Sequence, residues 1–123
     1  MSVPRRLALI AGAAALFASG SAAAHHGWAG YQQEDFSLTG RVVSADFAGA
    51  HGELRIQAEG GTWLAVLGPR SRNSRAGLNA SVVPVGATVT ARGHRHRDPR
   101  QLEMKTERLV VAGRTYDIYP DRS

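Results

Sequence analysis

Five histidines are the residues of this chain whose type best suits ligand chemistry. Two lie side by side near the start, one lies in the middle, and two are separated by a single residue. Histidine is the commonest ligand of copper and zinc in proteins, because a neutral imidazole nitrogen offers its lone pair at physiological pH. The candidate metal ligands are therefore His25, His26, His51, His94 and His96.

The segment before His25 explains why this histidine is the first candidate. Residues 1–24 contain two arginines, an apolar run and then small residues that end at Ala24, which is the organisation of a cleavable secretory signal. The apolar run is shorter than the roughly 20 residues that a membrane-spanning helix needs. We predict a Sec-type signal that is cleaved between Ala24 and His25, with the mature protein in the periplasm or secreted.

Cleavage at this position would give His25 two donor atoms. The new α-amine and the ring nitrogen can close a chelate ring around one ion, and one more imidazole completes a three-nitrogen set that suits Cu(II) in tetragonal geometry. We predict a copper site at the mature N-terminus, with His51, His94 or His96 as the further ligand and His26 in a lesser role. The alternative is that the histidines are solvated residues that bind nothing.

His94 and His96 form a second pattern within the predicted strand 88–97. Residues two apart on a strand project to the same side, so both rings could meet one ion. The same alternation places them with Arg92 and opposite the apolar Ala91. We therefore expect both rings to face outward, unless Gly93 carries a bulge.

The rest of the chain predicts an all-β fold. Alternating apolar residues and turn signals indicate strands at 36–47, 53–58, 62–67, 88–97, 102–111 and 114–119, with a short helix or turns at 69–79 that buries Leu78. In the first strand the apolar face changes phase, which predicts a bulge near Val42. In the fifth strand the alternation predicts Glu103, Lys105 and Glu107 on the outside.

This order of elements predicts a small OB-like barrel of five to six strands, with a short helical linker between strands three and four. We divide the chain into a signal peptide at 1–24, an N-terminal arm at 25–35 and the barrel domain at 36–123. Trp28 and Tyr31 are expected to pin the arm to the barrel. The length allows one domain, and the absence of cysteine excludes disulfides and a lipid anchor.

Composition and motifs limit the classes of function. The full chain has 15 basic and 10 acidic residues, and two of the arginines lie in the predicted signal, so the mature charge is mildly positive. We expect no nucleic-acid partner for an exported chain, no membrane anchor after cleavage, and a monomer. No pair of cysteines, phosphate-binding glycine loop or helical zinc-protease motif occurs, so we predict that the protein is not an enzyme.

Two main functions remain, and an oxidative copper enzyme with a terminal-histidine site is a remote third. The first is a metal-binding module that sequesters or hands on a transition metal ion, copper above all. The alternative is an OB-type module that binds an anionic envelope ligand or a partner protein without metal. Six arginines could serve the alternative: Arg70, Arg72, Arg75, Arg92, Arg95 and Arg97.

Several motifs of the mature chain resemble a family of small exported bacterial proteins of unknown function, whose mature chains open with His-His. The matching motifs are His25-His26-Gly27-Trp28, Leu38-Thr39-Gly40, Pro84-Val85-Gly86, Gly93-His94-Arg95-His96-Arg97-Asp98, Met104-Lys105-Thr106-Glu107-Arg108-Leu109, Gly113-Arg114-Thr115-Tyr116-Asp117 and Tyr119-Pro120. Where many relatives carry Asn-Pro-His, this chain has Gly49-Ala50-His51. The resemblance implies export and a shared fold, and it assigns no activity.

Overall fold

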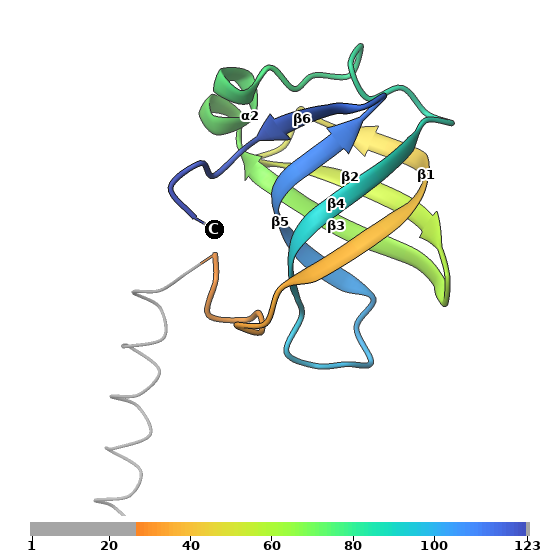
Figure 1. The fold of residues 1–123 in the computed structure, drawn as a ribbon, viewed down its shortest axis with the longest axis vertical. Coiled ribbons are helices and arrows are strands. Elements are labelled where there is room, and N and C mark those ends of the chain that lie inside the picture. The colour runs from red at the N-terminus through yellow and green to blue at the C-terminus, as the bar shows by residue number, and fades with distance from the viewer. Residues whose placement is uncertain (1–26, 123) are drawn as a thin grey trace, which may run out of the picture. The chain divides into compact units, whose positions relative to one another are not determined.

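The computed structural model describes residues 27–122, and the chain divides into two units between Gly30 and Tyr31. The predicted signal, His25 and His26 lie outside the described residues. Residues 27–30 form a turn. The second unit contains six strands and one short helix (Figure 1): β1 (Phe36–Asp46), β2 (His51–Ala58), β3 (Gly61–Pro69), α2 (Arg70–Ala76), β4 (Thr88–Arg95), β5 (Glu103–Val111) and β6 (Arg114–Asp117).

The strands close into a barrel. Their order is β3-β2-β1-β4-β5-β6, and β3 also pairs with β5 in parallel, from Leu64 opposite Glu103 to Val66 opposite Lys105. The helix α2 connects β3 to β4, and β6 extends the sheet beyond the closed ring. The predicted OB-like barrel is therefore confirmed. Within residues 27–122, no helix is long and apolar enough to cross a membrane.

The predicted bulge in β1 is also confirmed. The pairing of β1 with β2 shifts between Val42 and Ser44, so Val43 is 40% exposed while Val42 is fully buried. A Cβ atom on Gly40 would lie 2.4 Å from the carbonyl oxygen of Gln57. The glycine thus allows β1 and β2 to approach closely where the barrel bends.

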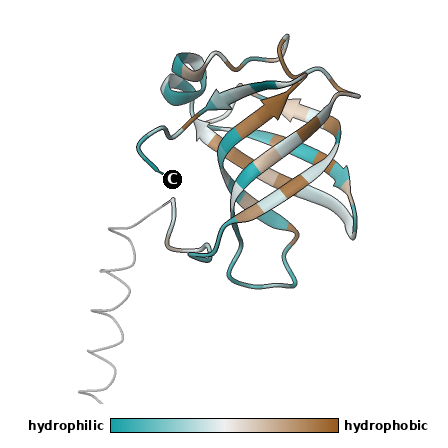
Figure 2. Ribbon diagram, in the orientation of Figure 1, coloured by the Kyte–Doolittle hydropathy of each residue, from teal (hydrophilic) through white to brown (hydrophobic). Residues whose placement is uncertain are grey.

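Large aliphatic side chains fill the barrel, as the alternating colours along the strands in Figure 2 indicate. Interior positions of small barrels are filled by side chains from every strand. Leu78, which follows α2, is buried as predicted. The largest fully buried apolar side chains are Leu54, Ile56, Leu67, Met104, Leu109 and Ile118.

The prediction for β5 was wrong at two of its three outward positions. Lys105 and Glu107 are each only 3% exposed. The reason is the segment after β6, which turns back along β5: the backbone N–H groups of Ile118 and Tyr119 both donate to the carbonyl oxygen of Glu107. The alternation of residues along a strand does not show whether a distant segment of the chain will bury its outer face.

Candidate functional site

The pairing of β4 with β5 is irregular next to Gly93. Arg92 lies opposite Arg108 but Gly93 lies opposite Thr106, which leaves Glu107 as an additional residue in β5. The bulge that the sequence allowed for at Gly93 is therefore present, with its extra residue on the neighbouring strand. A Cβ atom on Gly93 would lie 1.9 Å from the carbonyl oxygen of Lys105, so only glycine fits.

His94 is buried, with 5% of its surface exposed, which is the exception that the sequence allowed if Gly93 carried a bulge. The arm and the C-terminal segment cover it. Its Nδ1 atom lies 3.0 Å from the carbonyl oxygen of Glu34, and its Nε2 atom lies 2.7 Å from a carboxylate oxygen of Glu107. A carbonyl oxygen can only accept a hydrogen bond, so Nδ1 is a donor.

Glu107 is the centre of this buried group of charges. Burial raises the pKa of the Glu107 carboxyl, but hydrogen bonds from His94 and Arg122 lower it, and the net pKa lies below its ordinary value. Arg122 Nε donates to one carboxylate oxygen at 3.0 Å, and Arg108 donates to the other at 3.2 Å. Both ring nitrogens of His94 are engaged in hydrogen bonds. Ligation of a metal ion by His94 would therefore require the loss of one of them.

His96 lies just beyond β4 and is also hydrogen-bonded. Its Nδ1 atom accepts the backbone N–H of Asp98 at 2.9 Å, and its ring meets the ring of Tyr31 edge-on at 5.8 Å. His51 is exposed at the start of β2. Within residues 27–122, no three histidine, aspartate or glutamate side chains are placed to hold one metal ion, and a site that uses His25 or His26 stays a prediction.

The last residues of the arm are fixed to the barrel. The hydroxyl of Tyr31 donates to Glu103 at 2.5 Å, the backbone N–H of Gln32 donates to the Arg95 carbonyl at 2.8 Å, and Arg97 donates to the Tyr31 carbonyl at 3.2 Å. Burial and the Glu103 hydrogen bond raise the pKa of Tyr31. The predicted anchoring role of Tyr31 is confirmed, whereas Trp28 belongs to the other unit.

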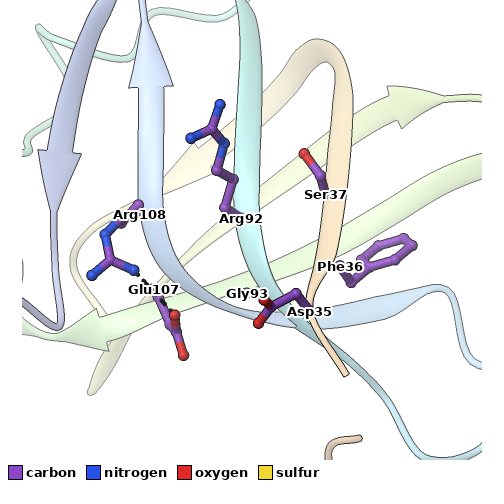
Figure 3. A pocket seen from close by; sticks show the side chains of 7 residues that line it. All are labelled: Asp35, Phe36, Ser37, Arg92, Gly93, Glu107 and Arg108. Atoms are coloured by element: carbon purple, nitrogen blue, oxygen red, sulfur yellow. Dashed lines mark hydrogen bonds and ion pairs between the residues drawn. The ribbon is translucent and has the colours of Figure 1, made fainter. Parts of the chain in front are cut away.

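A cavity of about 430 Å³ opens where the start of β1 meets β4 and β5. We call it the Arg92 pocket; its lining residues are Asp35, Phe36, Ser37, Arg92, Gly93, Glu107 and Arg108. Figure 3 shows the Arg92 and Ser37 side chains extending to one side of the pocket and those of Asp35 and Glu107 to the other. Of these residues, only Arg92 was predicted from the sequence as a ligand-binding group.

Three strands contribute one row of polar groups to the Arg92 pocket. Ser37 lies opposite Arg92 in the β1–β4 pairing, and Arg92 lies opposite Arg108 in the β4–β5 pairing. Residues directly opposite each other on antiparallel strands have neighbouring side chains, about 5 Å apart at Cβ. The row therefore offers a hydroxyl and two guanidinium groups at one level of the sheet.

The charged groups of the pocket differ in their partners. Arg108 is paired with Glu107 at 3.2 Å and with Asp117 at 3.3 Å. The side chains of Arg92 and Asp35, by contrast, make no hydrogen bond or ion pair with the rest of the described chain. The pocket thus contains one cation and one anion that the protein itself leaves available.

Most of the other arginines that the sequence suggested as ligand-binding groups already hold parts of the fold. Arg70 donates to the carbonyl oxygens of Ala48 and Gly49. Arg72 lies 4.5 Å from the Tyr119 ring centre, and Arg95 lies 4.8 Å from that of Trp63. Arg97 is hydrogen-bonded to the arm. Of the six arginines, Arg75 and Arg92 are therefore the two whose side chains have no partner in the described chain.

The replacement Glu107→Gln is expected to lower the free energy of unfolding at pH 7 by about 3 kcal/mol, because it removes the charge of the buried carboxylate with which Arg108 and Arg122 pair. The folded-state pKa of Glu107 lies below its ordinary value of 4.5, so its ionised form stabilises the fold above that value. This contribution is lost as the pH falls through the folded-state pKa. The difference from wild type should therefore shrink at pH 3.

Urea unfolding of both proteins at pH 7 and pH 3 measures this effect. Glu59→Gln is the matched control, because Glu59 is exposed and its loss of charge should change stability by less than about 0.5 kcal/mol. An equal loss of stability at both pH values would contradict the assignment of an ionised carboxylate.

Comparison with solved structures shows the fold alone. A chain of the S. pombe Stn1-Ten1 complex is similar with a TM-score of 0.51 and 13% identity over 63% of this chain and 57% of that chain. A ZRD-deleted mutant of TiaS in complex with agmatine has a TM-score of 0.48 and 16% identity over 69% and 26% of the two chains. This chain thus spans well under two thirds of either protein.

The family comparison covers a larger part of the chain. No curated protein matches it. One family model does, over residues 14–105, which include β1 to β4 and the start of β5. The chain belongs to the family of unknown function DUF6152.

Proposed function

We propose that the protein is an exported OB-like binding module that takes a small anionic ligand into the Arg92 pocket. The observation that carries the proposal is the guanidinium of Arg92, which lies on the wall of a cavity of about 430 Å³ without a partner in the described chain. A guanidinium fork matches carboxylate and phosphate groups with two parallel hydrogen bonds. The hydroxyl of Ser37 and the guanidinium of Arg108 lie beside it and would share the ligand's charge.

Like charges that lie directly opposite on neighbouring strands repel each other. Arg92 and Arg108 are in this position. The ion pairs with Glu107 and Asp117 neutralise the charge of Arg108 but not that of Arg92. An anion bound at Arg92 would neutralise the second guanidinium. The secretory signal predicted at residues 1–24 supports a ligand that the protein meets in the periplasm or outside the cell.

Arg92→Gln is expected to weaken the binding of small carboxylates or phosphate by at least about tenfold, because the replacement keeps a polar side chain but removes the charged fork. Isothermal calorimetry with acetate, propionate, butyrate and phosphate is the measurement. Arg75→Gln removes the same charge from α2, away from the pocket, and should leave affinity unchanged. Binding that is the same in wild type and Arg92→Gln would contradict the proposal.

A second candidate function is the capture of a transition metal ion, copper first, by the processed N-terminus. The observation that favours it is the position of His25-His26 directly after the predicted cleavage point. The further ligand would be His51, which is exposed at the start of β2, or His94 or His96, which would have to give up hydrogen bonds within the fold.

A further inference from the structure

The two charges without partners in the Arg92 pocket have opposite signs. Arg92 comes from the middle of β4, and Asp35 comes from the residue that precedes β1. Neither forms an ion pair with the other or with another described residue. Glu107 does not add a second available anion, because His94, Arg108 and Arg122 surround its carboxylate.

We propose that the ligand of the Arg92 pocket is a zwitterion, a small molecule with a carboxylate for Arg92 and an ammonium group for Asp35. This inference rests on the proposed anion-binding function and adds the second group of the ligand. In Figure 3, Arg92 with Ser37 and Asp35 with Glu107 occupy different sides of the pocket. A ligand with charge at both of its ends complements this arrangement.

A ligand with only negative charge would fit the pocket less well. Its charge would share the pocket with the carboxylate of Asp35, and like charges across an interface disfavour a partner. A zwitterion converts that repulsion into a second ion pair. The cavity of about 430 Å³ lies at the small end of the range for small-molecule sites, roughly 300 to 1,000 Å³, so the pocket suits a compact molecule.

The test uses pairs of probes that differ only in the amino group: glycine against acetate, β-alanine against propionate, and 4-aminobutyrate against butyrate. At least one amino acid should bind the wild-type protein at least about tenfold more tightly than its partner, because it adds one charge-assisted contact. Asp35→Asn should remove this preference while leaving the affinity for the simple carboxylate unchanged or higher.

Glu34→Gln is the matched control, because it removes one negative charge from the neighbouring residue, whose side chain does not line the pocket. It should retain the preference for the amino acid. If each carboxylate binds as tightly as its amino acid, or if Asp35→Asn keeps the preference, the zwitterion is wrong and the anion-binding function stands. If no probe of either kind binds, both proposals fail.

Discussion

Gly93→Ala is expected to lower the free energy of unfolding by about 3 kcal/mol or more, as overpacking against rigid backbone does. The added Cβ atom would lie 1.9 Å from the carbonyl oxygen of Lys105. That oxygen belongs to β5, which pairs with β3, β4 and β6. It cannot move away without disturbing three strand pairings. Urea or thermal unfolding of the two proteins measures the effect.

Gly49→Ala is the control for this replacement. Gly49 lies in the loop between β1 and β2, and a Cβ atom there would meet its nearest neighbour, the His51 carbonyl oxygen, at 3.4 Å. Its effect should stay within about 0.5 kcal/mol, as for ordinary surface changes. If Gly93→Ala is equally mild, the close approach of β4 to β5 is not as described.

A single residue added before His25 is expected to weaken Cu(II) binding by at least about 100-fold, provided that the terminal site exists. The extension converts the basic α-amine of His25 into an amide that must lose a proton before it can bind. One strong nitrogen donor and the chelate ring that it closes disappear together. Calorimetry and electron spin resonance of the processed and extended proteins measure the change, once intact mass has confirmed that the processed chain starts at His25.

Two further variants separate the donor atoms of this site. His25→Ala keeps the amine but removes the ring, and should reduce affinity about as much as the extension. His26→Ala should matter less, because its ring points away when the amine and ring of His25 share one ion. Equal affinity of the extended and processed proteins would rule out the terminal site.

The sequence was sufficient to predict the elements of the barrel and their order. Local patterns carried this information: the phase change of the apolar face around Val42 located the bulge in β1, and the glycine between Arg92 and His94 marked the point where the pairing of β4 with β5 becomes irregular. These features depend on residues that are neighbours in the chain. Alternation and turn chemistry report such neighbours directly.

The sequence was not sufficient where cover or contact comes from distant segments. The alternation along the strand predicted that Lys105 and Glu107 face solvent. Both are buried, because the residues after β6 lie over this part of β5. The Arg92 pocket joins residues 35–37, 92–93 and 107–108, and no local motif links these three segments. The available signal was indirect: a glycine in the middle of a strand, which often marks a close approach of backbones.

The pairing of β3 with β5 has a consequence for how the chain folds. The barrel cannot close until β5, near the C-terminal end, is available, because β5 pairs with both β3 and β4. Pairings between such distant segments fold slowly, on a timescale of about milliseconds to seconds. Until β5 pairs, the first three strands form an open sheet with unpaired edges. A chain truncated before residue 103 would lack β5, keep these edges unpaired and aggregate.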